Sequence, residues 1–240
     1  MAVKHNEHFR KNHFEKLAWE QGTLICGIDE VGRGCLAGPV VTAAVMLPAH
    51  KLSPLLKDSK IMSSEERLKA AAWIEKNCWY GIGSVHHRLI DQHNIWHATL
   101  IAMKRALMNL LSIAPYRPSA IVIDAMPLQL FDTSYNDIPV HYFPFGESRS
   151  SSIAAASIIA KVHRDALMQR IDAVFPGFHL GQHKGYSTPL HKRVLQETHS
   201  QLVIHRQNFL KNVFAPQEAP PEGIQQSILE DASDISLYLD

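Results

Sequence analysis

The sequence predicts an α/β domain built on a mixed sheet. Short apolar runs rich in β-branched residues come first, and helical patterns then alternate with further runs of the same kind. The 240 residues suffice for about one large domain with terminal segments. Hydrophobic residues make up 46% and charged residues 20%, which is typical of a soluble globular protein that buries a sizeable core.

Five segments are expected to be strands, because each is short, apolar and bounded by glycine, proline or polar residues. They are residues 23–29, 38–47, 79–85, 120–125 and 139–143. Helical patterns fill the intervals between them. Ser63 to Glu66 opens one helix with capping residues and early acids. The other helices are expected over residues 90–112, 148–173, 187–198 and 201–213.

The two ends of the chain differ from the middle. The first 20 residues are basic and are expected to form a short amphipathic helix or a basic arm. Residues 215–240 contain three prolines, six acids and no lysine or arginine, a composition typical of disorder. We therefore expect an N-terminal extension over residues 1–21, a catalytic domain over 22–214 and an acidic tail over 215–240.

Charge and cysteine content narrow the class of protein. The net charge is +1, so any nucleic-acid site has to be a local basic patch. The sequence has neither an apolar run of the ~20 residues that span a bilayer nor a secretory signal pattern. Cys26, Cys35 and Cys78 form no CxxC pair. These features predict a reduced, cytoplasmic protein without membrane contact, and we expect it to be a monomer.

The stretch GIDEVGRG, residues 27–34, places two acids at the end of an expected strand. Its glycine spacing is close to that of a phosphate-binding loop. Such a loop requires lysine followed by serine or threonine, whereas this one has Arg33 and Gly34. Asp29 and Glu30 would also direct negative charge at the phosphate. Adjacent carboxylates instead suit a hard cation such as Mg²⁺, which prefers oxygen ligands and is often shared with substrate phosphates.

Further acids follow other apolar segments. A two-metal site for phosphate cleavage needs three or four carboxylates. Asp124 ends the run AIVID, Glu147 precedes a helix rich in small residues, and Asp165 lies within that helix. Each acid alone is typical of a solvated turn. The combination of Asp29, Glu30 and Asp124 at two strand ends favours metal binding.

Six motifs in order carry a resemblance to a known family. They are GIDEVGRG with GPVVTAAV, then LKDSK, LIDQHNIWHATLIAM, VIDA, SSSIAAASIIAKVHRD and HKGYSTPLH. Over residues 22–200 the chain resembles bacterial ribonuclease HII, the type 2 ribonuclease H family. The resemblance implies a ribonuclease H-like fold: a mixed five-stranded sheet flanked by helices, with a helical C-terminal part.

The resemblance also implies an activity. Members of the family are Mg²⁺- or Mn²⁺-dependent endonucleases that cleave RNA within RNA–DNA hybrids and at single ribonucleotides embedded in duplex DNA. The products carry 3′-hydroxyl and 5′-phosphate ends, and the reaction starts ribonucleotide excision repair. Of the two metals, one makes hydroxide available near neutral pH and the other stabilises the leaving 3′-oxygen.

The family's four acidic positions fall on Asp29, Glu30, Asp124 and Glu147. Glu147 departs from the family pattern, because the usual residue there is aspartate, and the extra methylene changes the reach of the carboxylate. Cys35 stands where the family usually has proline, and Ile61 stands where it usually has a second lysine. The change at Ile61 removes one possible contact with a nucleic-acid backbone.

Substrate recognition has to find a 2′-hydroxyl, since that group distinguishes RNA from DNA. By resemblance, Gly32, Arg33, Gly34 and Tyr186 read the step from ribonucleotide to deoxyribonucleotide. Candidate phosphate contacts are Lys60, Lys161, Lys184 and Arg193. Lys60 and Arg193 are equally compatible with solvated surface charges, and Lys161 with an ion pair within its own helix. Residues 235–239, ISLYL, match a sliding-clamp docking peptide poorly.

Three alternatives stay open at this stage. His93 and His97 have the i, i+4 spacing of a helical metal pair, but no HExxH motif and no obvious third ligand accompany them, so surface histidines are favoured. A different metal-dependent nuclease on the same fold would use the same acids, although the GRG and GYSTPLH motifs argue against it. A non-catalytic nucleic-acid-binding relative would not need all four carboxylates.

Overall fold

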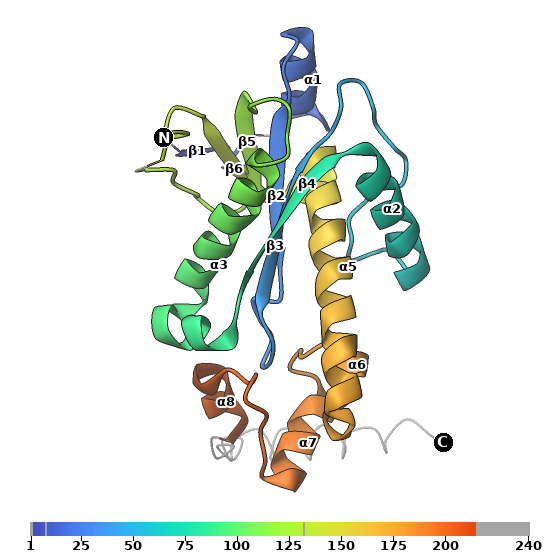
Figure 1. Cartoon of the computed structure of the whole chain (residues 1–240), viewed down its shortest axis with the longest axis vertical. Helices are drawn as coiled ribbons and strands as arrows, with labels where there is room; N and C mark the ends of the chain where they lie inside the picture. Colours follow the sequence, from blue (N-terminus) through green and yellow to red (C-terminus); the bar gives the residue numbers. More distant parts are fainter. Residues whose placement is uncertain (1, 8, 132, 215–240) are drawn as a thin grey trace, which may run out of the picture.

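The computed structural model describes residues 2–7, 9–131 and 133–214. A six-stranded mixed sheet, in the order β1-β6-β5-β2-β3-β4, forms the centre of the molecule. Helix α3 covers one face of this sheet, and α5 with α2 covers the other (Figure 1). The predicted mixed α/β architecture is confirmed. The strands are β1 Ala2–Lys4, β2 Ile25–Val31, β3 Val40–Met46, β4 Trp79–Val85, β5 Ala120–Asp124 and β6 Val140–Phe143.

The sheet has one strand more than the five expected. Strands β1, β6, β5 and β2 are parallel, whereas β3 runs antiparallel to both β2 and β4. The additional strand β1 comes from the segment expected to be a helix or a basic arm, and Ala2 pairs with Val140. Three residues are too few for their alternation to indicate a strand. They are ordered as a strand because the edge of β6 offers them backbone partners.

The helices follow the predicted pattern with three differences, the first being two additional short helical turns within residues 176–183. The helices are α1 His13–Glu20, α2 Ser64–Asn77, α3 His87–Leu111, α4 Gly146–Arg149, α5 Ser151–Val174, the 3-10 turn η1 Pro176–Phe178, α6 Leu180–His183, α7 Pro189–Thr198 and α8 Gln207–Phe214. The helix predicted over 148–173 is divided at Ser150, which caps α5. Helix α8 begins later than predicted, after a loop. Ser63 and Glu66 form the expected capping box of α2.

Small residues let the two large helices lie directly on the sheet. A Cβ atom added at Gly83 of β4 would be 2.0 Å from the carbonyl oxygen of Ala102 in α3. One added at Gly27 of β2 would be 2.2 Å from the carbonyl carbon of Ser152 in α5. The alanines over 154–156 of α5 are fully buried against β3. Close packing therefore fixes the distance of both helices from the sheet, and with it the positions of their side chains relative to the strands.

The C-terminal helices lie beyond the end of the sheet (Figure 1). Helices α6, α7 and α8 pack around Leu36, Ala37, Leu180, Leu195 and Leu210, so the predicted helical C-terminal part is confirmed. The acidic tail, residues 215–240 with the segment 235–239, lies outside the described residues. Within the described ranges, no helix combines the length and the apolar character required to cross a membrane.

Candidate active site

The sheet register places two of the four predicted acids, Asp29 and Asp124, side by side. Ile28 of β2 pairs with Ile123 of β5, so Asp29 and Asp124 are neighbours one position further along these parallel strands. Strand β5 ends at Asp124 because the next residue, Ala125, adopts a positive φ of 54°. Glu147 comes from α4, the short helix that follows β6. All four carboxylates line one pocket of about 480 Å³.

Mutual repulsion and burial dominate the electrostatics of this pocket. Burial, followed by the charges of Glu30, Asp124 and Glu147, raises the pKa of Asp29 well above its ordinary value. Burial also raises the pKa of Glu30, and the neighbouring Arg33 partly offsets that rise. The guanidinium of Arg33 lies 3.4 Å from Glu30. A bound divalent cation would remove the repulsion and let these carboxylates stay ionised at neutral pH.

Glu147 is held by a network from two other segments. Its Oε2 accepts a hydrogen bond from the backbone N–H of Ser59 at 2.8 Å. Its Oε1 accepts one from the Ser157 hydroxyl at 2.9 Å and lies 3.2 Å from the ammonium of Lys60. Burial, and then Asp58, raises the pKa of Glu147, while Lys60 opposes this rise. The longer side chain of glutamate thus connects α4 to the loop that carries Ser59 and Lys60.

The acids fit a hydrated cation better than a closed metal cage. Among the described residues, no three acidic, histidine or cysteine side chains form a preassembled ligand set. Mg²⁺ does not require one, because it keeps several waters and shares oxygens with substrate phosphates. Glu30 Oε2 is buried without a hydrogen-bond partner. A buried carboxylate oxygen left without a donor is suited to a cation.

Two buried arginines, which were not predicted from the sequence, hold the Gly32–Gly34 loop and the segments beside it. Arg206 donates to the carbonyl oxygens of Gly32 at 2.7 Å and Arg33 at 2.9 Å, and also to Gly38. Arg164 of α5 donates to the carbonyl oxygens of Ala37, Pro39 and Lys184. Only Arg164 leaves a sequence signal: it follows Ala156 and Ala160 and precedes Met168 at four-residue steps, on the buried stripe of α5.

Tyr186 lies in the same pocket as the Gly32–Gly34 loop. The backbones of Tyr186 and Cys35 form an isolated antiparallel bridge, which fixes the tyrosine beside the loop. The ammonium of Lys161 lies 5.2 Å and the guanidinium of Arg164 lies 5.6 Å from the centre of the tyrosine ring. These contacts leave the ring half-buried, so one part of it remains available to a ligand.

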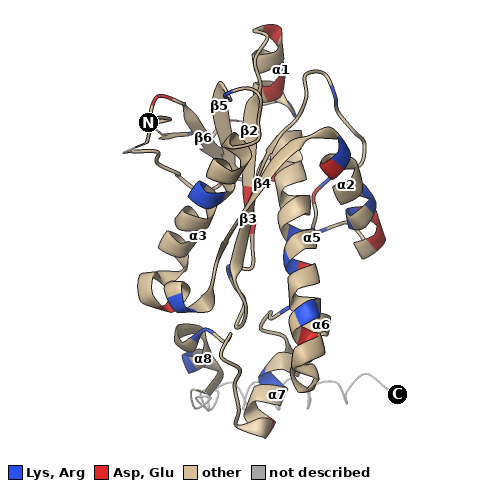
Figure 2. Ribbon diagram, in the orientation of Figure 1, with Lys and Arg blue, Asp and Glu red and all other residues tan. Residues whose placement is uncertain are grey.

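The candidate phosphate contacts divide into two groups. Lys60 and Lys161 line the pocket. Lys161 also forms an ion pair with Asp165 at 2.9 Å, in agreement with the alternative raised for it from the sequence. Lys184 donates instead to the carbonyl oxygen of Gly181, and Arg193 is exposed on α7 outside the pocket. Figure 2 shows the acidic part of β2 at the centre, with basic residues along α5 and on α7 and α8.

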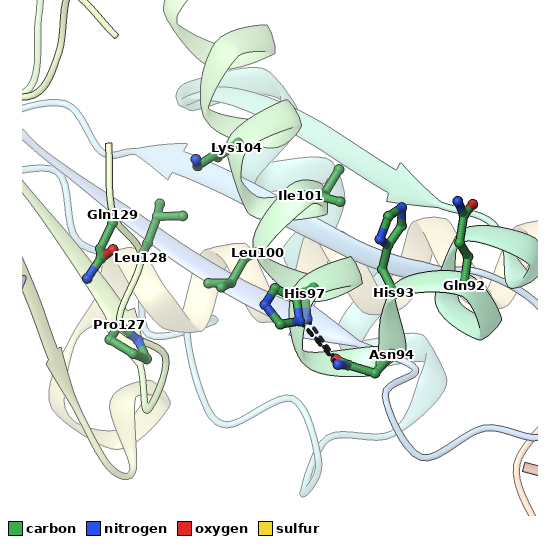
Figure 3. Close-up of a pocket in the computed structure, with 10 residues that line it drawn as sticks. All are labelled: Gln92, His93, Asn94, His97, Leu100, Ile101, Lys104, Pro127, Leu128 and Gln129. Carbon is green, nitrogen blue, oxygen red and sulfur yellow. Dashed lines mark hydrogen bonds between the residues drawn. The ribbon is translucent and has the colours of Figure 1, made fainter. Parts of the chain in front are cut away.

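His93 and His97 lie on a separate open pocket between α3 and the segment that follows β5 (Figure 3). Both are exposed, and Asn94 between them has a positive φ of 67° that interrupts the helix. The His97 ring hydrogen-bonds to the Asn94 side chain. The helical i, i+4 geometry is therefore broken, and the prediction of surface histidines is confirmed.

Comparison with known proteins decides the family. The model of the family Ribonuclease HII matches residues 26–215. The chain belongs to the ribonuclease HII family. The ribonuclease HII of Levilactobacillus brevis is 42% identical over 200 residues, which cover 82% of this chain and 73% of that protein. Membership makes this protein a ribonuclease H, a hydrolase that acts as an endonuclease on RNA–DNA substrates.

Solved structures of related enzymes share the fold. The ribonuclease HII of Archaeoglobus fulgidus, solved in complex with PCNA, superposes on this chain with a TM-score of 0.64 at 24% identity. The superposed region covers 81% of this chain and 98% of the Archaeoglobus fulgidus chain. Bst-RNase HIII in complex with Mn²⁺ has a TM-score of 0.59 at 26% identity and covers 80% of this chain and 68% of that one. Ribonucleases H use divalent metals, in keeping with the donor set of the pocket.

Proposed function

We propose that this ribonuclease HII is a Mg²⁺- or Mn²⁺-dependent enzyme that nicks duplex DNA on the 5′ side of a single embedded ribonucleotide. It leaves 3′-hydroxyl and 5′-phosphate ends, and it also cleaves the RNA strand of longer hybrids. One observation carries the proposal: four carboxylates from three separate segments share a pocket with the Gly32–Gly34 loop and Tyr186. The acids serve cleavage and the loop serves recognition of one sugar.

Asp29, Glu30, Asp124 and Glu147 are the proposed ligands of the catalytic cations. Divalent cations held there would supply a water activated for attack and would stabilise the leaving oxygen. The protein's own residues prepare this site in advance. Arg33 offsets part of the negative charge of Glu30, and the backbone N–H of Gly146 donates to Asp124 Oδ1 at 3.0 Å, which orients that carboxylate.

The recognition residues act on the sugar next to the scissile bond. The carbonyl groups of Gly32 and Arg33 are engaged by Arg206, so the loop presents a fixed backbone. Gly32 has a φ of 90°, a value suited to glycine, and a Cβ there would also meet the Arg164 side chain at 2.4 Å. The Tyr186 ring faces the same space and fits against a deoxyribose without a 2′-hydroxyl. Lys60 and Lys161 are the proposed phosphate contacts.

One experiment tests the function directly. A labelled DNA duplex with a single ribonucleotide is incubated with the full-length protein and Mg²⁺ or Mn²⁺, with and without EDTA. We expect a nick on the 5′ side of the ribonucleotide that EDTA abolishes. Cleavage of an all-DNA duplex at the same rate would indicate a different nuclease activity. Binding without any cleavage in either metal would indicate a non-catalytic relative.

Three further expectations belong to this proposal. We expect the protein to act in the cytoplasm, as a monomer, in ribonucleotide excision repair. Residues 235–239 are the candidate segment for docking on a sliding clamp, and the PCNA complex of the Archaeoglobus fulgidus protein names a partner of the kind to test. Co-elution with a sliding clamp that is lost on deletion of residues 235–239 would support docking, and unchanged co-elution would exclude this segment.

A further inference from the structure

Two buried side chains of the N-terminal segment hold the start of α5. The backbone N–H of Ser151 donates to Asn12 Oδ1 at 2.8 Å. The Ser150 hydroxyl and the Ser152 N–H donate to Glu15 Oε1 at 2.6 and 3.0 Å. Asn12 and Glu15 are 7% and 1% exposed, so these bonds are shielded from water. The contacts connect segments about 140 residues apart in the chain.

These bonds satisfy groups that α5 cannot satisfy itself. The first N–H groups of a helix have no acceptor within it. At α5, Asn12 and Glu15 accept from the first two, and the Ser150 hydroxyl accepts from Ile153 N–H at 3.2 Å. Within the described residues, no lysine, arginine or histidine forms an ion pair with Glu15. Its carboxylate instead lies at the positive end of a 24-residue helix.

The same turn of α5 is bounded by the active-site strand and by α4. Ser152 contacts Gly27 of β2 so closely that a Cβ at this glycine would be 2.2 Å away, and Gly27 precedes Asp29 by two residues. On the other side, Ser150 N–H donates to the Gly146 carbonyl, while the backbone N–H of Asn12 donates to the Arg149 carbonyl at 2.8 Å. These bonds bracket Glu147 between Gly146 and Arg149.

We propose that Asn12 and Glu15 are positioning residues for the Glu147 carboxylate, an inference that rests on the proposed role of Glu147 as a cation ligand. Loss of Glu15 leaves the Ser150 hydroxyl and Ser152 N–H without their acceptor. The first turn of α5 and the adjoining α4 then shift relative to Asp29 and Asp124. The N-terminal segment is thereby part of the scaffold of the cation site, although it contributes no ligand to it.

The test measures cation binding without nucleic acid. Thermal unfolding of full-length wild type and of Glu15→Ala is followed over a range of Mn²⁺ concentrations. Replacing a residue that orients a metal ligand typically lowers metal affinity 10–100-fold. We therefore expect the half-saturating Mn²⁺ concentration of Glu15→Ala to be about ten times that of the wild type. Glu15→Gln keeps one acceptor oxygen and should show a smaller rise. At saturating Mn²⁺ the KM for substrate should stay near the wild-type value, because other residues hold the recognition loop.

A matched control separates positioning from general loss of stability. Leu110→Ala removes a buried side chain of α3 on the opposite face of the sheet. It should lower the melting temperature while keeping the wild-type Mn²⁺ half-point. A wild-type half-point in Glu15→Ala would overturn the proposal. If that variant does not fold, Asn12→Ala decides in the same way, with a raised half-point in support and an unchanged one against.

The outcomes also distinguish this inference from the proposed function. Mn²⁺ binding is measured without substrate, so a Glu15 effect in a protein that fails to nick would leave the positioning role intact and contradict only the activity. A wild-type protein that nicks normally, together with an unchanged half-point in Glu15→Ala and Asn12→Ala, would contradict only the positioning role.

Discussion

The two halves of the pocket are held in place by different means. The carboxylate half consists of Asp29, Glu30, Asp124 and Glu147, and three of these lie on paired strands of the sheet. The recognition half consists of the Gly32–Gly34 loop and Tyr186, which lie outside regular strands and depend on Arg164 and Arg206. The proposed cation ligands thus lie mainly on paired strands, whereas the proposed recognition residues depend on long-range bonds from side chains to backbone.

The largest effect is expected from the carboxylate half. Asp124→Asn keeps the shape of the side chain and removes its charge. Altering even a residue that supports a metal ligand changes activity 10–100-fold, so loss of the ligand charge should reduce cleavage by more than about a hundredfold. Binding of the ribonucleotide-containing duplex should survive, because the phosphate contacts lie elsewhere. Kinetics at saturating Mn²⁺ and a gel-shift assay measure the two effects; wild-type turnover would refute the assignment of Asp124.

In the recognition half, loss of a buried arginine should first of all lower the stability of the protein. Arg206→Met removes the donors to the buried carbonyls of Gly32 and Gly38 and to the part-buried carbonyl of Arg33. Each orphaned buried acceptor costs about 1–3 kcal/mol, so the free energy of unfolding should fall by roughly 3 kcal/mol. Discrimination between a single ribonucleotide and all-DNA duplex should weaken as well. Arg193→Met, at an exposed arginine of α7, is the control and should change stability by less than about 0.5 kcal/mol.

Three buried histidines are expected to make the recognition half sensitive to acid. His183 and His191 stack at 4.0 Å, and His191 and His205 are joined by a hydrogen bond of 3.0 Å. Burial lowers the pKa of all three, that of His191 to about 4. The His191 ring bonds to the Tyr186 carbonyl oxygen. Protonation of this cluster would therefore disturb the position of Tyr186.

The sign of the pH effect follows from these lowered pKa values. In the unfolded chain the His191 ring takes up a proton near pH 6.5, whereas in the folded protein it stays neutral until about pH 4, because its pKa is lowered. Its contribution to stability is complete above pH 6.5 and is lost as the pH falls from there to 4. The shift corresponds to something on the order of 3 kcal/mol. His191→Gln should flatten the fall of melting temperature over this range, while exposed His93→Gln should not. An equal slope in both variants would rule out the cluster as its source.

The comparison also explains which features the sequence could predict. The placement of Asp29 and Asp124 at strand ends could be predicted, because strands are local patterns and the carboxylates that end them are visible in the sequence. Arg206 could not be singled out, because its partners are backbone carbonyls distant in the chain, which leave no mark on composition. Arg164 has distant carbonyl partners too, and its place on the buried stripe of α5 was the one sign of its role. Glu15 was not predicted because its partners, too, are distant in the chain. Strand β1 was not predicted because it is too short to show alternation. Lys184 has a positive φ of 53° and bonds to the Gly181 carbonyl, and the identity of the residue indicates neither feature.

The smallest effect is expected from the loss of the Tyr186 ring, which separates the role of Tyr186 from that of the Gly32–Gly34 loop. Tyr186→Ala removes a ring that lies beside the Gly32–Gly34 loop. If the ring packs against the deoxyribose that follows the ribonucleotide, a 2′-hydroxyl on that sugar would clash with it. Aromatic stacking on nucleic acids is worth roughly 1–3 kcal/mol, and a sugar contact should lie at the lower end. Activity at a single embedded ribonucleotide should therefore fall about tenfold, since 1.4 kcal/mol is a factor of ten.

The decisive measurement is a ratio of two rates. On a continuous RNA–DNA hybrid no junction has to be read, so Tyr186→Ala should lose less kcat/KM there than on the single ribonucleotide. Tyr186→Phe keeps the ring and should retain the wild-type ratio, because the proposed contact uses the face of the ring and not its hydroxyl. Equal losses on both substrates, together with a lowered melting temperature, would mean that Tyr186 only supports the bridge to Cys35. The recognition half would then consist of the Gly32–Gly34 loop alone, positioned by the two buried arginines.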